Sequence, residues 1–219
     1  MWLPESASSY APKIDHLFWV ITIITGFFFF VVQGCLLFLV LKYRAKPGKK
    51  AEYVHGSTWV EVIWTVIPAV ILLWLTIASQ RLWVEIRSPN RMPKTSFQVQ
   101  ILAEQFAWNI RYPGPDGQFD TPDDIQTINQ LHLPIGEPTL IKLQSKDVIH
   151  SFFVAEFRVK QDAVPGLPTQ VWIEATKAGQ FEIRCAELCG LGHYRMRGFV
   201  TTESRQNLQT WLAETKANE

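Results

Sequence analysis

Two cysteines, a histidine and a methionine lie within twelve residues of the chain. They are Cys185, Cys189, His193 and Met196. Thiolate, imidazole and a weakly bound thioether are the ligands of electron-transfer copper sites in proteins. This spacing therefore predicts a copper site. The alternative is a disulfide between the two cysteines, which is plausible outside the cytoplasm, beside an incidental His and Met.

Copper sites of this kind also need a second imidazole, and His150 is the best candidate for it. It lies in the segment Asp-Val-Ile-His-Ser, at the start of a predicted strand and 35 positions before Cys185. Adjacent loops at one end of a β-sandwich bring such distant residues together. Two thiolates, two imidazoles and one thioether suffice for two copper ions bridged by both sulfurs, with one His on each metal. Met196 and a loop carbonyl would complete the coordination.

The part of the chain after Arg91 has the pattern of short β-strands. Apolar and polar residues alternate over segments that are separated by turn sequences such as Pro-Gly-Pro-Asp-Gly at 113–117. The predicted strands are 96–102, 107–112, 139–144, 151–154, 169–175, 179–184 and 198–202. Short strands with no strong helix between them predict an antiparallel β-sandwich or Greek-key barrel. Ser204 is placed to cap a final amphipathic helix over 205–216.

The strand before the cysteines predicts where the copper site lies. Alternate side chains of a strand share a face, so Phe181, Ile183 and Cys185 are expected to point into the core. The glycine-rich loop that follows can fold back and bring the other sulfur and imidazole ligands to the same point.

Two long uncharged runs explain the unusual composition of the chain. It is 47% hydrophobic and 19% charged, whereas a soluble domain carries about 25% charged residues. The runs are 17–41 and 62–80, with 25 and 19 residues. As helices they would measure about 37 and 28 Å, enough to cross a bilayer. The first run is too long for a signal peptide and follows no basic segment. We therefore expect a hairpin with membrane spans at 17–41 and 59–85.

The charges around these spans predict the orientation of the hairpin. The loop 42–58 carries five basic residues and one acidic residue, so the positive-inside rule places it in the cytoplasm. The segment 1–16, the β-domain 94–204 and the tail 205–219 then lie outside. Residues from 94 onward carry a net charge of −3, which would attract a basic partner in a salt-sensitive way. The total of +1 argues against nucleic-acid binding.

Three polar features outside the copper motif have alternative interpretations. Glu61, beside the second run, either reaches the lipid headgroups or faces a protein interior as part of a proton path. The acidic loop from Asp116 to Asp124 lacks the spacing of a calcium loop and is interpreted as a solvated turn. His132 is interpreted as structural, because the copper ligand set is complete without it.

The motifs together resemble subunit II of the haem-copper cytochrome c oxidases. The pattern C-x-E-x-C-x3-H-x2-M, preceded by D-V-x-H-S, is highly specific, and the likeness covers nearly the whole chain. It includes E-x-x-W-T at 61–65 and Phe-Arg-Val-Lys-Gln-Asp-Ala-Val-Pro-Gly at 157–166. The resemblance implies a two-helix transmembrane hairpin followed by an all-β, cupredoxin-like Greek-key sandwich or barrel domain.

The resemblance also implies roles for single residues. The binuclear copper centre of that family, called CuA, has ligands that match His150, Cys185, Cys189, His193, Met196 and the backbone carbonyl of Glu187. The Glu187 carboxylate matches a group that helps to bind magnesium or manganese at the boundary with subunit I. Glu61 matches a carboxylate near the mouth of a proton path into subunit I. Asp162 matches an acidic position near the surface where cytochrome c docks.

One position departs from the family pattern. The family usually has Gln-Trp-x-Trp where this chain has Gln105-Phe106-Ala107-Trp108. The first Trp of the family is the aromatic through which electrons enter, so Phe106 and Trp108 are the candidates for this role. Phe106 keeps the ring but lacks the indole donor. The replacement implies a different donor or route, or Phe106 is only a packing residue.

The function implied by the resemblance is that of a relay subunit in a terminal oxidase. The chain would accept electrons from a cytochrome c-type donor at two copper ions and pass them to haem in subunit I. Reduction of oxygen to water, coupled to proton pumping, would take place in subunit I, and subunit III is a further expected partner. The complex would lie in the bacterial inner membrane, with both termini and the copper domain on the periplasmic side.

Three other functions fit parts of the pattern. A quinol oxidase subunit II has a similar hairpin and sandwich, but it lacks the copper ligands that are present here. Nitrous oxide reductase shares the CuA pattern, but its large additional domain does not fit in 219 residues. A membrane-tethered copper-binding or assembly protein would bind copper through the same ligands but would not transfer electrons. Glu61 and the segment 160–166 favour the oxidase over this last alternative.

Overall fold

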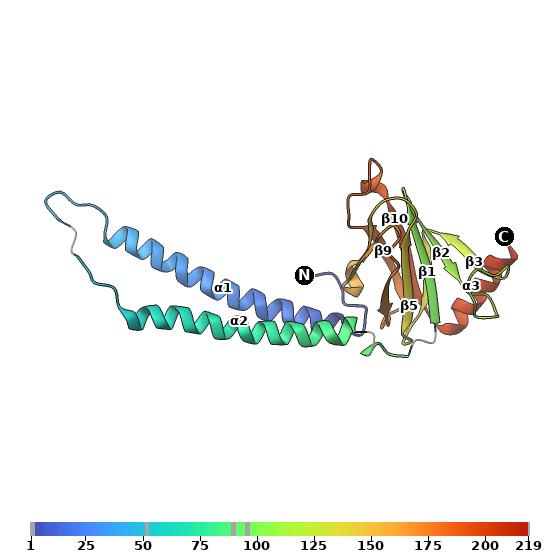
Figure 1. Ribbon diagram of the computed structural model, residues 1–219, viewed down its shortest axis with the longest axis horizontal. Helices are drawn as coiled ribbons and strands as arrows, with labels where there is room; N and C mark the ends of the chain where they lie inside the picture. Colours follow the sequence, from blue (N-terminus) through green and yellow to red (C-terminus); the bar gives the residue numbers. More distant parts are fainter. Residues whose placement is uncertain (1–2, 51–52, 89–90, 95–96, 219) are drawn as a thin grey trace. The chain divides into compact units, whose positions relative to one another are not determined.

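The computed structural model of the chain describes residues 3–50, 53–88, 91–94 and 97–218. The chain forms two compact units (Figure 1). The helical unit comprises 13–85, and the β-unit combines 1–12 with 86–219. Parts of the predicted segments lie outside the described residues, namely 1–2, 51–52, 95–96 and 219.

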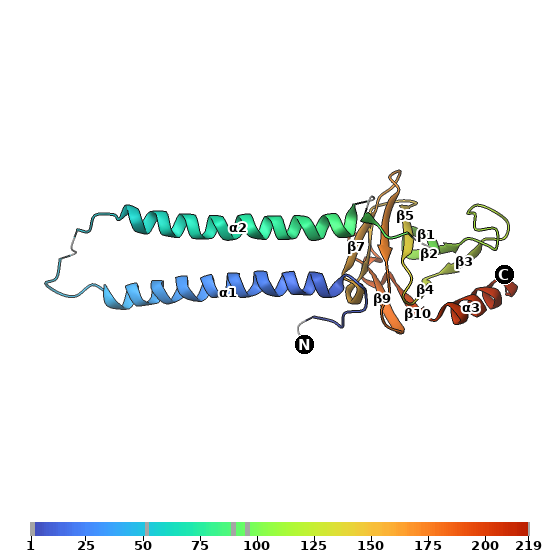
Figure 2. The same ribbon diagram turned by 90° about the horizontal axis from the view of Figure 1, so that it is seen from below.

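Two antiparallel helices form the helical unit (Figures 1 and 2). They are α1 (Ala11–Lys42) and α2 (Thr58–Arg87), and the predicted spans 17–41 and 59–85 lie within them. Apart from Ala11, neither helix buries a residue. Both are long and apolar enough to cross a membrane. Apolar side chains exposed along such helices need an apolar solvent, and a helix satisfies its own backbone hydrogen bonds there.

The described part of the β-unit contains ten strands in two sheets. They are β1 (Phe97–Glu104), β2 (Ala107–Tyr112), β3 (Ile125–Ile128), β4 (Gln130–Pro134), β5 (Thr139–Ser145), β6 (His150–Val154), β7 (Val159–Ala163), β8 (Thr169–Ile173), β9 (Gly179–Cys185) and β10 (Arg197–Glu203). One sheet has the order β3-β2-β1-β5-β8 and the other β4-β10-β9-β6-β7. Alternate residues are buried, as in β2, where Trp108, Ile110 and Tyr112 face the core. This is the packing of a β-sandwich.

The prediction of purely antiparallel strands was wrong, because both sheets are mixed. β1 pairs with β5 in parallel, and β4 pairs with β10 in parallel. The strands β3, β4 and β7 were also missed, and all three lie at sheet edges. An edge strand has neighbours on one side only, so it needs fewer apolar residues to be stable. The polar segment Gln-Thr-Ile-Asn-Gln at 126–130 therefore lacks a strand pattern, although it contributes to β3 and β4.

Residues near the N-terminus pack onto the β-unit. Ala7, Ser8 and Tyr10 are buried, and Ser8 forms a β-bridge with Ala175. The Tyr10 hydroxyl donates to the Trp172 carbonyl at 3.0 Å, and the two rings meet edge to face at 5.0 Å. Part of the predicted segment 1–16 is thus built into the β-domain.

The predicted C-terminal helix and its cap are confirmed. Helix α3 spans Arg205–Ala217, and the Ser204 hydroxyl accepts a hydrogen bond from the Asn207 backbone. Trp211 of α3 stacks on His132 with ring centres 3.6 Å apart. His132 Nδ1 also lies 2.7 Å from a Glu203 carboxylate oxygen. These contacts agree with a structural role for His132.

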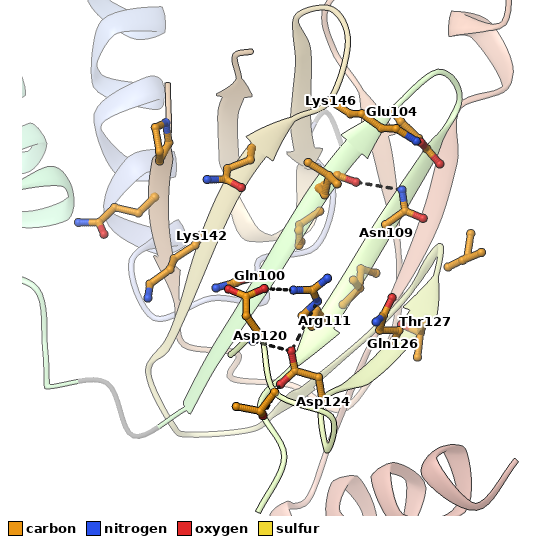
Figure 3. A pocket seen from close by; sticks show the side chains of 18 of the residues that line it. Gln100, Glu104, Asn109, Arg111, Asp120, Asp124, Gln126, Thr127, Lys142 and Lys146 are labelled. Atoms are coloured by element: carbon orange, nitrogen blue, oxygen red, sulfur yellow. Dashed lines mark hydrogen bonds and ion pairs between the residues drawn. The ribbon is translucent and has the colours of Figure 1, made fainter. Parts of the chain in front are cut away.

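The acidic loop between β2 and β3 is not simply a solvated turn. Asp124 is buried, and its carboxylate lies 3.6 Å from Arg111 Nε. Asp120 pairs with the same guanidinium (Figure 3). The pairs border a groove of about 1180 Å³ on the outer face of the sheet that contains β1 and β2. Part of the acidic charge is therefore neutralised within the fold.

Candidate metal centre

Strand pairing brings together the two ligand segments that are distant in the sequence. His150 is the first residue of β6, and Cys185 is the last residue of β9. These strands are neighbours, with Phe152 opposite Cys185. His150 and Cys185 therefore meet at one end of the sandwich, and both are buried.

The loop between β9 and β10 folds back on itself, as predicted. The Cys185 backbone N–H donates to the Met196 carbonyl at 3.3 Å, which closes the loop. Inside it, His193 begins a short 3-10 helix, η3 (His193–Arg195). Cys189 and Met196, which belong to this loop, have buried side chains. The fold-back brings the predicted ligands of the loop to one point.

Two thiols and two imidazoles surround that point. The Cys185 and Cys189 sulfurs are 3.7 Å apart, and both cysteines are free. His150 Nδ1 lies 3.9 Å from the Cys185 sulfur, and His193 Nδ1 lies 3.6 Å from the Cys189 sulfur. The sulfurs are too far apart for a disulfide, whose S–S bond is about 2.05 Å. They are close enough to share an ion, because metal–thiolate bonds are about 2.3 Å.

A thioether and a carbonyl complete the donor group. Met196 Sδ lies 3.7 Å from the Cys189 sulfur, and the Glu187 carbonyl oxygen lies 3.2 Å from the Cys185 sulfur. The Glu187 carboxylate is directed elsewhere and accepts from Lys160 Nζ at 2.8 Å. Each sulfur thus has its own imidazole and one further donor. Two soft sulfurs, two imidazoles and a thioether are a donor set that suits copper.

Asp147 orients His150 from outside the donor group. Its carboxylate lies 2.8 Å from His150 Nε2 and also accepts the backbone N–H groups of Gln105 and Val148. Burial opposes the charge on Asp147, but the hydrogen bond from His150 and those from the backbone hold the pKa of Asp147 below its usual value. An ionised carboxylate can only accept, so Nε2 carries the proton and Nδ1 is free to bind a metal.

The Cys189 thiol is poorly ionised in the absence of a cation. Burial, together with the neighbouring Cys185, raises the pKa of Cys189 to about 12. Two buried thiolates side by side repel each other and lack solvation. A bound cation offsets both costs, because thiolates are the form that binds metals.

The turn between β1 and β2 packs directly on the cysteine loop. Gln105 Nε2 donates to the Cys189 carbonyl at 2.6 Å. The Phe106 ring lies so close to Gly192 that a Cβ there would be 2.5 Å from a ring carbon. A Cβ on Gly190 would likewise be 2.6 Å from Gln105 Nε2. Small residues in the loop therefore allow this close approach.

The other candidate for electron transfer, Trp108, lies in the core behind the metal centre. Its side chain is fully buried, and its ring centre is 6.3 Å from that of His150 and 5.8 Å from that of Phe152. Phe106 is only partly buried. Of the two rings, Phe106 is thus the one that a docked protein can reach.

Two further predicted residues, Asp162 and Glu61, are not among the donors. Asp162 is opposite Ser151 in the β6–β7 pair, and its carboxylate accepts from the Ser151 hydroxyl at 2.6 Å. Glu61 is in the first turn of α2, in the helical unit, and is exposed.

Sequence reasoning missed Asp147 and Gln105 as supports of the centre. Asp147 belongs to the quoted D-V-x-H-S motif, so its position three residues before His150 was an available signal. Gln105 belongs to the aromatic motif, but no local pattern indicates its contact with Cys189, which is 84 residues away.

Comparisons with known proteins identify the family. The family described as cytochrome c oxidase subunit II, transmembrane domain, matches residues 1–82. The family described as cytochrome c oxidase subunit II, periplasmic domain, matches residues 98–202. The chain belongs to the cytochrome c oxidase subunit II family. The subunit II family is a copper-binding one, and its match over both long helices makes this chain a membrane protein.

Individual members of the subunit II family align over nearly the whole chain. The alternative cytochrome c oxidase subunit 2 of Bradyrhizobium diazoefficiens is 32% identical, over 93% of this chain and 79% of the relative. Cytochrome c oxidase subunit 2 of Thermostichus vulcanus is also 32% identical, over 98% of this chain and 79% of the relative.

A solved structure supports the fold of the β-unit. The crystal structure of the periplasmic domain of cytochrome oxidase subunit II from Bradyrhizobium japonicum is similar with a TM-score of 0.52 and 25% identity. The match covers 58% of this chain and 98% of that domain. The predicted fold, a two-helix hairpin followed by a cupredoxin-like sandwich, is confirmed.

Proposed function

We propose that this chain is the electron-accepting subunit of a membrane haem-copper oxidase and that it holds two copper ions. Its ligands would be His150, Cys185, Cys189, His193, Met196 and the carbonyl of Glu187. The observation that carries the proposal is the pair of free sulfurs 3.7 Å apart, each with its own imidazole. These residues would hold two ions better than one, because a single ion would leave donors unused.

The residues of the chain prepare a rigid and largely buried site. When bound, a copper pair supplies a one-electron redox centre whose change of charge is shared by two ions. Burial of Cys185, Cys189 and Met196 limits the access of water to these three donors. Asp147 keeps His150 in the metal-binding tautomer, and Gln105 holds the carbonyl of Cys189. Such pre-organisation lowers the structural rearrangement that accompanies electron transfer.

The chain acts between a donor protein and a partner subunit. A cytochrome c-type donor would deliver electrons beside Phe106, with Trp108 behind it and Asp162 as the predicted acidic docking residue. The chain would pass them to haem in subunit I, where oxygen is reduced and protons are pumped, and subunit III would complete the core. The Glu187 carboxylate would help to bind magnesium or manganese at the boundary with subunit I.

The two helices would lie in the bacterial inner membrane with the β-unit on the periplasmic side. Five basic residues in the loop 42–58 support this orientation through the positive-inside rule. Glu61 begins α2 next to that loop and would face a proton path into subunit I.

Copper analysis of the full chain in detergent tests the proposal. We expect two copper ions per chain and an electron paramagnetic resonance spectrum in which one unpaired electron couples to two equivalent coppers. Cys189→Ser should abolish this spectrum, because one of the two sulfur donors shared by the site would be lost. Cys35→Ser, which changes the exposed thiol of α1, is the matched control and should leave it intact. One ion per chain, or coupling to a single copper, would contradict the proposal.

A further inference from the structure

Asn129 occupies the single position between two strands that belong to different sheets. Strand β3 ends at Ile128 in one sheet, and β4 begins at Gln130 in the other. The backbone of Asn129 is left-handed, with φ 60°. Asn is one of the few residues with a side chain that adopt this conformation readily. Asn129 is therefore the point at which the chain crosses from one sheet to the other.

Asn129 bonds to both backbone polar groups of Trp108. Its side-chain Oδ1 accepts the Trp108 N–H at 2.9 Å, and its own N–H donates to the Trp108 carbonyl at 2.8 Å. The Trp108 side chain is fully buried, and its indole Nε1 has no hydrogen-bond partner among the residues that the structure describes. The position of the ring therefore depends on how the backbone is held and on packing.

The Trp108 ring packs in turn against a candidate metal ligand. Its centre is 6.3 Å from that of the His150 ring, at an interplanar angle of 64°. His150 is fully buried, and Asp147 binds its Nε2. A hydrogen bond at one ring atom fixes that atom but lets the ring pivot about it, so a packed neighbour is needed to fix Nδ1 as well. Trp108 is such a neighbour.

The carbonyl of Asn129 bonds to a strand that leads away from another candidate ligand. It accepts the Phe199 N–H at 2.8 Å. A Cβ on Gly198 would lie 2.9 Å from the same carbonyl oxygen, so a side chain there would force the carbonyl to move. Both residues belong to β10, which begins at Arg197, directly after Met196. Asn129 is thus bonded to the strand that follows the thioether.

We propose that Asn129 is a positioning residue of the metal centre. It holds Trp108 against His150 and ties that ring to β10, the strand that follows Met196. The inference rests on the proposed copper-binding function and adds a residue that is not itself a ligand. Residues behind the ligands affect metal affinity and geometry because they limit how far each ligand can move.

Two substitutions separate the side-chain hydrogen bond of Asn129 from its backbone conformation. Asn129→Gly keeps the left-handed backbone but removes the acceptor of the Trp108 N–H, whereas Asn129→Asp keeps an acceptor. The first measurement is amide hydrogen exchange at Trp108 in the copper-free full chain in detergent. We expect exchange about fivefold to tenfold faster in Asn129→Gly and unchanged in Asn129→Asp.

Copper affinity and the paramagnetic spectrum of the same variants test the positioning itself. Asn129→Gly should bind copper about tenfold more weakly and with a changed copper hyperfine splitting. Asn129→Asp should match the wild type in both measurements. Asp120→Gly places a glycine at another left-handed position, in the acidic loop, and is the matched control. An Asn129→Gly chain that is less stable but keeps the wild-type affinity and spectrum would overturn the inference.

A double substitution shows whether Asn129 acts through Trp108. Trp108→Leu removes the ring beside His150 and should change the spectrum in the same direction as Asn129→Gly. Combining the two should bring no further loss of copper affinity, because both break one chain of contacts. Gly198→Ala displaces the Asn129 carbonyl from the side of β10, should have the same effect, and decides the question if Asn129→Gly does not fold. Fully additive losses would rule out the route through Trp108.

The wild-type chain separates this inference from the proposed function. If it binds copper without coupling between two ions, the proposed function fails. Amide exchange at Trp108 and the relative copper affinities of the variants then still test the positioning role. If the wild type has the binuclear spectrum and Asn129→Gly shares it unchanged, the function stands and the inference fails.

Discussion

At the scale of single residues, the orientation of His150 depends on a carboxylate three positions earlier. Asp147 accepts a hydrogen bond from His150 Nε2, and this contact leaves Nδ1 directed at the Cys185 sulfur. Backbone N–H groups from two different loops hold Asp147 in place. The metal centre is therefore supported by a residue that does not itself belong to the donor group.

Asp147→Asn should weaken copper binding by about 10-fold to 100-fold, the usual effect of losing such a partner. An amide can donate to Nε2 and so favours the tautomer with the proton on Nδ1. Competition with a chelator of known affinity measures the change on the full chain. Asp116→Asn, the same substitution in the exposed acidic loop, is the control. Equal affinities for both variants would contradict the orienting role.

At the scale of elements, the metal loop depends on close packing against the β1–β2 turn. Gly192 has an ordinary backbone conformation, with φ −91°, so its lack of a side chain matters only for space. The Phe106 ring occupies the space that a Cβ would need. The loop and the turn therefore constrain each other.

Gly192→Ala should displace the cysteine loop and lower copper affinity, and Phe106→Ala in the same chain should restore much of the loss. Overpacking of this kind typically costs about 1–3 kcal/mol. Copper content and the paramagnetic spectrum give the readout. Gly34→Ala in α1, where a Cβ meets no atom within 4 Å, is the control. A Gly192→Ala chain with an unchanged spectrum would show that the packing is not restrictive.

The N-terminal segment is a second element whose packing can be tested. Tyr10 is 3% exposed, and burial raises the pKa of its phenol well above the usual value, against a smaller lowering effect of Arg87. The pKa of Tyr10 is thus higher in the folded chain than in the unfolded chain, where it is about 10. The neutral, buried phenol therefore contributes its full stabilisation below about pH 10. The stabilisation is lost as the pH rises above about 10.

Tyr10→Phe should therefore unfold with a weaker pH dependence above about pH 10. At pH 7 the variant should be about 1 kcal/mol less stable, because the Trp172 carbonyl loses its hydrogen bond from Tyr10. Denaturant unfolding followed by tryptophan fluorescence measures both effects. Tyr194→Phe, at an 84% exposed position, should match the wild type. Parallel pH profiles for wild type and Tyr10→Phe would be inconsistent with burial of an ionisable phenol.

At the scale of the whole molecule, the two units carry different candidate functional residues. The donor group belongs to the β-unit, whereas Glu61 belongs to the helical unit. A carboxylate at the start of a membrane helix is costly unless it has a function or reaches the headgroups. The proposed proton role of Glu61 can thus be separated from electron acceptance.

Glu61→Gln in the assembled oxidase should slow oxygen consumption several-fold while the copper centre is reduced at the normal rate. The amide keeps the size of the side chain but cannot release a proton. Stopped-flow reduction and oxygen uptake on the same preparation give the two rates. Glu85→Gln, at the other end of α2, is the control. Equal slowing of copper reduction would contradict the separation.

The sequence by itself determined the apolar spans, most of the central strands, the C-terminal helix and the candidate ligands, because these depend on local composition and spacing. Only the tertiary structure decided which strands are neighbours. The pairing of β6 with β9 places His150 beside Cys185, and close approach of the β1–β2 turn adds Gln105 to the surroundings of Cys189. The edge strands also escaped prediction, because an edge strand needs little alternation of apolar and polar residues. The parallel pairs escaped it because this alternation does not show whether two neighbouring strands run in the same direction. The net charge of the β-unit can be counted in the sequence, but only the fold shows which charged residues lie near the metal loop.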